Sequence, residues 1–256
     1  MIERAELYRR MLANLTRFYR LIGERSPRCS LVDREGLVAC VCPPAANRSF
    51  FNGVVYTDPD VLGAALDDLA AAYEDAGVRA WTVWVPEEDE AAGRALGAAG
   101  SVLDAAPRAM MAPLQEIDVR DGAGDLDWRP LEDPDEVAPL AGPAFGMEPE
   151  VTAAASRGLR GELRVYVARG EGRDVACLGT LDVERDCGVY MVATDPAARG
   201  RGLATALMRQ ALLEARERGL QTTSLQATAM GAPLYARLGY RDCGAIQMWE
   251  RRRASG

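Results

Sequence analysis

The sequence predicts a layered α+β protein in which helices flank a mixed central sheet, arranged as two tandem domains. Three observations carry this prediction. Apolar residues alternate between helical spacing and short strand-like runs along all 256 residues. The chain is 48% hydrophobic and 27% charged, which is typical of a globular protein with a sizeable core. Residues 116–127 are rich in Gly and Asp and poor in core-type residues, which indicates a linker between domains 1–115 and 128–256.

The first half is predicted to begin with a helix over residues 3–22. Its apolar stripe at helical spacing consists of Leu7, Met11, Leu15, Phe18 and Ile22. Turn residues and alternation predict the elements that follow. These are a hairpin over 30–42, a strand at the end of 43–56, a helix over 61–77, a strand over 81–86, a helix over 87–100 and a strand over 107–114.

The second half mixes helices and strands in a different order. We expect a strand over 128–131, helices over 135–146 and 149–158, strands over 163–170, 174–184 and 187–194, a helix over 201–218, a strand over 222–228, a helix over 232–239 and a strand over 245–250. Helices both interrupt the strands and follow them, which favours a mixed sheet covered by helices. The halves are similar in size and alternation, although no sequence repeat links them.

Composition excludes several kinds of chemistry. The chain has no histidine and no lysine, and its 30 basic residues are all arginine. A histidine base, a histidine metal site, a Schiff-base lysine and a Walker lysine are therefore excluded, and we expect no metal. The net charge of −8 makes nucleic acid an unexpected partner. No apolar run has the length of a membrane span and the start is unlike a signal peptide, so we expect a cytoplasmic protein without membrane contact. The cysteines, such as Cys40 and Cys42, are expected to be small buried residues.

One short stretch, residues 199–202, places arginine and glycine alternately between an apolar run and an amphipathic helix. The first turn of a helix offers free N–H groups and a positive dipole end. Glycine allows close approach of the backbone, and arginine adds donors that match phosphate oxygens. The stretch therefore predicts an anion site, with a solvated tight turn as the alternative.

The same stretch resembles the coenzyme loop of the GNAT superfamily of acyl-CoA-dependent N-acyltransferases. Residues 199–204, RGRGLA, match its (Q/R)-x-x-G-x-(G/A) pattern. The likeness covers about residues 128–250 and is most specific over 189–240, where strand, turn, helix, strand and LYARLGY follow in the family's order. Residues 1–115 lack the loop and resemble a degenerate copy of the fold, which would not bind the coenzyme.

The resemblance implies acetyl-CoA as co-substrate and assigns residues to it. The amides that would hold its pyrophosphate belong to Arg199, Gly200, Arg201, Gly202, Leu203, Ala204 and Thr205. The strand that would pair with its pantetheine arm includes Val192, Ala193 and Thr194. Tyr235 would protonate the leaving thiolate, because a phenol keeps its proton at neutral pH. Thr228 stands where many members have asparagine, so the coenzyme contact there departs from the pattern.

The remaining assignments concern the acceptor, which we expect to be a small-molecule primary amine that attacks the thioester directly. Candidate bases are Glu184 and Asp182. Candidate pocket residues are Tyr190, Asn52 and Trp84. We expect a monomer or a homodimer. Two alternatives stay open: a non-catalytic acyl-CoA sensor, and a transferase of the same fold that uses another acyl donor such as aminoacyl-tRNA.

Overall fold

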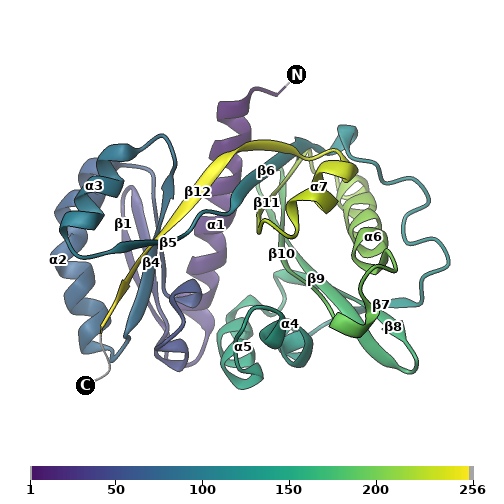
Figure 1. Cartoon of the computed structure of the whole chain (residues 1–256), viewed down its shortest axis with the longest axis horizontal. Coiled ribbons are helices and arrows are strands. Elements are labelled where there is room, and N and C mark those ends of the chain that lie inside the picture. The colour runs from purple at the N-terminus through teal and green to yellow at the C-terminus, as the bar shows by residue number, and fades with distance from the viewer. Residues whose placement is uncertain (1, 254–256) are drawn as a thin grey trace.

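The computed structural model describes residues 2–253 and confirms a mixed sheet flanked by helices (Figure 1). One sheet of 12 strands runs through the whole molecule in the order β1-β2-β3-β4-β12-β6-β11-β10-β9-β8-β7, with β5 paired to β12. Only the pairs β3–β4 and β10–β11 are parallel within the part of the chain described. The two halves therefore share a single sheet.

The N-terminal half contains three helices and six strands among the described residues. Their bounds are α1 Arg4–Arg25, β1 Ser30–Arg34, β2 Leu37–Val41, β3 Gly53–Tyr56, α2 Pro59–Asp75, β4 Ala80–Pro86, α3 Glu90–Ala98, β5 Val102–Ala105 and β6 Arg108–Pro113. Short 3-10 turns cover Pro43–Ala45, Ser49–Phe51 and Leu114–Glu116. Strand β5 was not predicted, because its mostly exposed side chains give no apolar alternation.

The C-terminal half follows the predicted order of elements. Their bounds are β7 Trp128–Leu131, α4 Ala138–Ala144, α5 Pro149–Ser156, β8 Leu163–Gly170, β9 Arg173–Val183, β10 Asp186–Thr194, α6 Leu203–Glu217, β11 Thr222–Ala227, α7 Ala232–Leu238 and β12 Arg241–Arg252. Further 3-10 turns cover Pro134–Val137, Arg157–Leu159 and Pro196–Ala198. The last strand is much longer than the predicted 245–250.

The two halves exchange a strand each. Strand β6 leaves the N-terminal half and pairs with β11 over all of its residues, from Thr222↔Pro113 to Ala227↔Arg108. Strand β12 begins beside β6 and then crosses into the N-terminal half, where Ile246 to Arg252 pair with β4 (Figure 1). In each half, a parallel pair of strands is therefore followed by a strand supplied by the other half. This similarity agrees with a degenerate GNAT-like N-terminal half.

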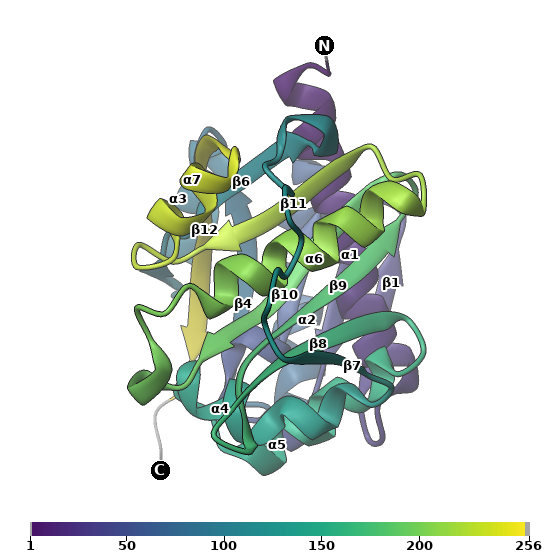
Figure 2. The ribbon, with the colours of Figure 1, turned by 90° about the vertical axis from the view of Figure 1, so that its right-hand side faces the viewer.

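Helix α1 packs between the halves and confirms its predicted stripe. All five stripe residues are at most 2% exposed and belong to the central apolar cluster, which also holds side chains from β2, β9 and β10. Helices α2 and α3 cover a second cluster on the N-terminal half (Figure 1). Helix α6 lies across β10 and β9 over a third cluster (Figure 2). The arginine–glycine loop leads from β10 into α6 on this face of the sheet.

Candidate active site

The arginine–glycine loop connects the end of β10 to α6. Asp195 opens it by accepting a hydrogen bond from the Ala197 N–H at 2.8 Å. Gly200 and Gly202 then have φ of +77° and +78°, in the left-handed region that favours glycine. A Cβ at either position would meet nothing within 4 Å. Backbone conformation, and not lack of space, therefore explains both glycines.

The first turn of α6 has amides that the chain itself leaves free. Its N-cap is Gly202, which offers no side-chain acceptor, and the Ala206 N–H is the first to bond into the helix, at 3.0 Å to the Gly202 carbonyl. Within residues 2–253 the N–H groups of Leu203, Ala204 and Thr205 have no hydrogen-bond partner. Three such amides at the positive end of a 15-residue helix can donate hydrogen bonds to an anion.

The two arginines of the loop are also uncommitted. Both are exposed, and in the described part of the chain neither forms an ion pair; Arg199 donates only to the Thr194 carbonyl, at 3.3 Å. Most other arginines of this chain are paired with carboxylates, among them Arg173 with Asp195 beside the loop. Arg199 and Arg201 therefore keep their donors for an external anion.

The N-terminal half provides an internal comparison. Helix α2 occupies in that half the place that α6 occupies here, between the two parallel strands. Its N-cap, however, is Asp58, whose Oδ1 accepts hydrogen bonds from the N–H groups of Asp60 and Val61. A carboxylate of the chain thus fills the helix end and would repel a phosphate. This difference predicts that the first half binds no anion at the start of α2.

Strands β10 and β11 separate well before β10 reaches the loop. Their parallel pairing covers only Asp186 to Gly188 with Thr222 to Ser224. Strand β10 then contains a bulge between Tyr190 and Ala193, with Met191 at φ +53°. The edge of β10 that faces β11 is consequently unpaired from the bulge to Thr194. An extended ligand can add to such an edge through main-chain hydrogen bonds, and the predicted residues Val192, Ala193 and Thr194 lie there.

Tyr235 lies on α7 in the third cluster, which also holds side chains from β10 and β11. Its side chain is 8% exposed, and its ring packs edge-on against Tyr240 at 5.9 Å between centroids. Burial raises the pKa of Tyr235 to about 12, so the phenol stays protonated at neutral pH. Its hydroxyl has no partner among the residues that the structure describes. Thr228 accepts a hydrogen bond from the Gly231 N–H at 3.2 Å and so helps to begin α7.

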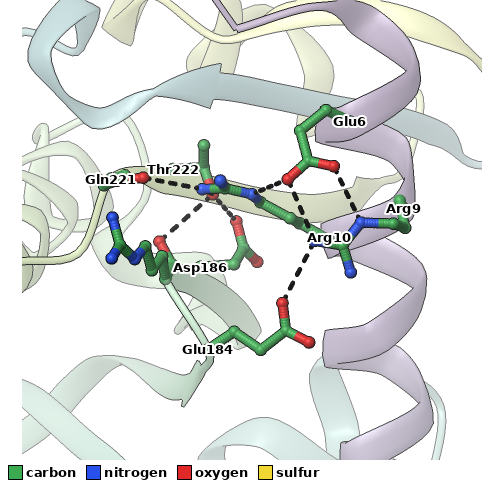
Figure 3. A network of polar contacts seen from close by, with 8 residues as sticks. Glu6, Arg9, Arg10, Glu184, Asp186, Gln221 and Thr222 are labelled. Carbon is green, nitrogen blue, oxygen red and sulfur yellow. Dashed lines mark hydrogen bonds and ion pairs between the residues drawn. The ribbon is translucent and has the colours of Figure 1, made fainter.

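The predicted bases lie away from the loop and have arginine partners. Asp182 accepts hydrogen bonds from Arg218 at 2.8 and 3.1 Å and from Arg164 at 2.8 Å. Glu184 lies in the turn before β10 and pairs with Arg9 of α1 at 3.3 Å (Figure 3). Because a strand rises about 3.3 Å per residue, this turn is roughly 25 Å from Thr194 along β10. The structure does not bring these carboxylates to the loop, and their role as bases stays a prediction.

The three predicted pocket residues are buried and bonded within the protein. Tyr190 stacks on Phe18 at 4.5 Å and donates to the Asn14 Oδ1 at 2.9 Å. The Asn52 amide accepts from the Cys42 N–H and donates to two carbonyls of the loop 43–52. The Trp84 Nε1 donates to the Tyr19 hydroxyl at 2.7 Å. The Tyr190 contacts join α1 to β10, and those of Asn52 and Trp84 lie within the N-terminal half. A role of the three residues in an acceptor pocket stays a prediction.

Sequence reasoning missed a buried polar cluster under α1. The Asp186 carboxylate is 1% exposed and accepts hydrogen bonds from Thr222, Ser224 and Asn14 at 2.6–3.0 Å. Around its rim, Arg10 contacts Thr222 at 3.5 Å and pairs with Glu6 (Figure 3). Burial raises the pKa of Asp186, and these hydrogen bonds oppose the shift. The available signal was Asn14, a polar residue on the apolar stripe of α1.

Comparison with known proteins agrees with this geometry. A family model described as an acetyltransferase (GNAT) domain matches residues 161–242. Those residues form a GNAT acetyltransferase domain. Human N-acetyltransferase 8B is 33% identical over 99 residues, which are 34% of this chain and 43% of that relative. The match thus spans less than half of the relative's length.

Solved structures extend the likeness to both halves. A GCN5-related N-acetyltransferase from Kribbella flavida has a TM-score of 0.70 at 18% identity, over 95% of this chain and 96% of its own. Another from Sphaerobacter thermophilus has a TM-score of 0.59 at 20% identity, over 88% and 83%. At these identities the likeness establishes the fold. Among residues 2–253, no helix has the length and apolar character needed to cross a membrane.

Proposed function

We propose that this protein transfers an acetyl or other small acyl group from coenzyme A to a small-molecule primary amine. The observation that carries the proposal is the start of α6. There, two left-handed glycines, three free amides and two unpaired arginines converge after an open strand edge. The matching helix end of the first half is closed by Asp58, so the chain offers one such site among its two related halves.

The donor would lie along β10 and end at α6. We assign its pyrophosphate to the amides of Leu203, Ala204 and Thr205 and to the guanidinium groups of Arg199 and Arg201. We assign its pantetheine arm to the unpaired edge from Val192 to Thr194, where an extended chain can form main-chain hydrogen bonds. This orientation directs the thioester towards the bulge of β10 and the parting of the strands.

The proposed reaction needs few catalytic side chains. A neutral amine attacks the thioester carbonyl directly, and the charge that develops on its oxygen is stabilised by main-chain N–H groups. Holding the two reactants together supplies much of the rate enhancement. Tyr235 then donates its proton to the departing thiolate, a role that its protonated hydroxyl and its freedom from internal hydrogen bonds support.

The proton of the amine would be taken by Asp182, Glu184 or water. Asp182 and Glu184 are engaged with arginines at the far end of β10. The variants Asp182→Asn and Glu184→Gln test them. If the replaced residue is the base, its variant should lose turnover at neutral pH and recover it at alkaline pH, where the amine is already deprotonated. Unchanged turnover in both variants would assign this step to water.

Calorimetric titration with acetyl-CoA is the first test of the proposal. The double variant Arg199→Ala/Arg201→Ala should bind at least about tenfold more weakly, because each hydrogen bond to a charged group contributes about 1.5–3 kcal/mol. The control Arg79→Ala/Arg185→Ala removes the same charge at exposed positions elsewhere and should bind normally. Equal binding by both double variants, or no binding by the parent protein, would remove the coenzyme from this site.

The variant Tyr235→Phe separates an enzyme from a sensor. In an enzyme it should bind acetyl-CoA normally and lose about 10²-fold or more in turnover with an accepted amine, as expected for loss of a general acid. A sensor would bind acetyl-CoA with no turnover to lose. A protein that binds aminoacyl-tRNA and not acetyl-CoA would instead support the other donor class.

A further inference from the structure

Two cysteines of the N-terminal half lie opposite each other at the open end of a hairpin. Strands β1 and β2 pair from Arg34↔Leu37 to Ser30↔Val41, so Cys29 and Cys42 come next in the register. Their Sγ atoms are 3.2 Å apart. A disulfide needs an S–S distance of about 2.05 Å, so a movement of roughly 1 Å would join them.

The backbone at this pair favours close side chains. The Cys29 N–H donates to the Ser26 carbonyl, and the Cys42 N–H donates to the Asn52 Oδ1. Neither amide is therefore bonded across the hairpin. Opposite residues without cross-strand hydrogen bonds have the shorter separation in antiparallel pairs, and this separation suits a disulfide.

The two thiols differ in access and acidity. Cys29 is partly exposed, whereas Cys42 is fully buried. The hydrogen bond with Cys42 holds the pKa of the Cys29 thiol below its ordinary value despite partial burial, and the nearby Arg28 acts in the same direction. That hydrogen bond and burial raise the pKa of Cys42. Cys29 is thus suited to react first and Cys42 to react second.

We propose that Cys29 and Cys42 form a thiol–disulfide site whose oxidant is a small disulfide such as oxidised glutathione. The Cys29 thiolate attacks one glutathione sulfur, which forms a mixed disulfide and releases one glutathione thiolate. Cys42 loses its proton to solvent and attacks the Cys29 sulfur, which forms the Cys29–Cys42 bond and releases the second thiolate. The protein loses two electrons and two protons, and the oxidant gains two glutathione thiols.

The site lies where the two halves meet. Ser26, just before Cys29, donates its hydroxyl to the Ala155 carbonyl at 2.7 Å and accepts from the Gly158 N–H at 2.8 Å. Cys42 begins the loop 43–52, and Pro43–Ala45 of that loop packs against α5. A disulfide would therefore join the segment after α1 to the loop that supports α5, and the oxidised protein should melt at a higher temperature than the reduced protein.

The test is equilibration of the reduced, desalted full-length protein in glutathione redox buffers, followed by mass spectrometry. The native protein should lose two hydrogens, with one cross-linked peptide pair that contains Cys29 and Cys42. The variant Cys42→Ser should retain one glutathione on Cys29, whereas Cys29→Ser should gain none. The control Cys40→Ala removes the neighbouring buried cysteine and should still form the bond.

Two results would overturn the proposal. The first is a native protein that stays fully reduced, or gains glutathione without a cross-link, in the most oxidising buffer. The second is a disulfide between Cys29 and Cys40 that forms in Cys42→Ser as readily as the cross-link of the native protein. Should a variant fail to fold, the native protein alone still decides, because the cross-linked peptides are mapped directly and both redox forms can be melted.

Discussion

Replacing Gly188 with alanine should reveal how α1 is fastened to β10. A Cβ at this position would lie 2.2 Å from the Asn14 Oδ1 and 2.7 Å from its Nδ2, so the asparagine would have to move. Its displacement breaks hydrogen bonds with the Leu181 carbonyl, the Asp186 Oδ2 and the Tyr190 hydroxyl, all of them buried. Each buried group left unpaired costs about 1–3 kcal/mol, so we expect a loss of at least about 3 kcal/mol.

Urea unfolding of Gly188→Ala, Asn14→Ala and the double variant measures this. Because the three atoms nearest to the added Cβ all belong to Asn14, alanine at 188 should cost less than about 1 kcal/mol once Asn14→Ala has removed them. Gly188 has no positive φ, so alanine is otherwise compatible with its backbone. Additive losses in the double variant would refute the reasoning, since the glycine would then matter for another reason.

Three further perturbations test other parts of the structure by unfolding. Burial raises the pKa of Asp186 above its ordinary value of 3.8, so the native protein should lose stability as pH rises from 3.8 through the folded pKa. Asp186→Asn should remove this pH dependence, and the variant should gain stability relative to the native protein over that window. Gly239→Ala should lower the free energy of unfolding by about 1–3 kcal/mol more than Gly219→Ala. Both glycines have positive φ, but only a Cβ at 239 would meet a carbonyl oxygen, that of Glu116 at 2.8 Å. Asn52→Ala should lower the free energy of unfolding by about 3 kcal/mol, since it frees three main-chain groups; a change in acceptor KM without this loss would instead favour a pocket role.

Local patterns predicted the parts of the molecule that depend on local physics. The stripe from Leu7 to Ile22 required only helical spacing, and all of its residues are buried. Alternation of arginine and glycine before a helix predicted an anion site or a tight turn, and the positive φ of Gly200 and Gly202 fits both. The domain type of residues 161–242 followed from the same stretch.

Contacts between distant residues could not be read in the same way. Asp186 looks like a hairpin residue in the sequence, and only the docking of α1 buries it beside Asn14. The partners of Glu184 and Asp182 include Arg9, Arg164 and Arg218, which no local spacing associates with them. Alternation predicted the strand 107–114 but not that it would pair with β11. The apolar pattern of a strand shows which face is buried, and it does not specify which other strand lies beside it.

The strand exchange makes the N-terminal half part of the sheet that carries the candidate site. Without the N-terminal half, β11 would lose β6 and present an open edge from Thr222 to Ala227, immediately beside the parting of β10 and β11. Tyr190, one residue before the positive φ of the β10 bulge, would also lose its stacking partner Phe18 and the acceptor of its hydroxyl. The capped helix α2 thus belongs to a half whose strand β6 and helix α1 support the strands that lead to the arginine–glycine loop.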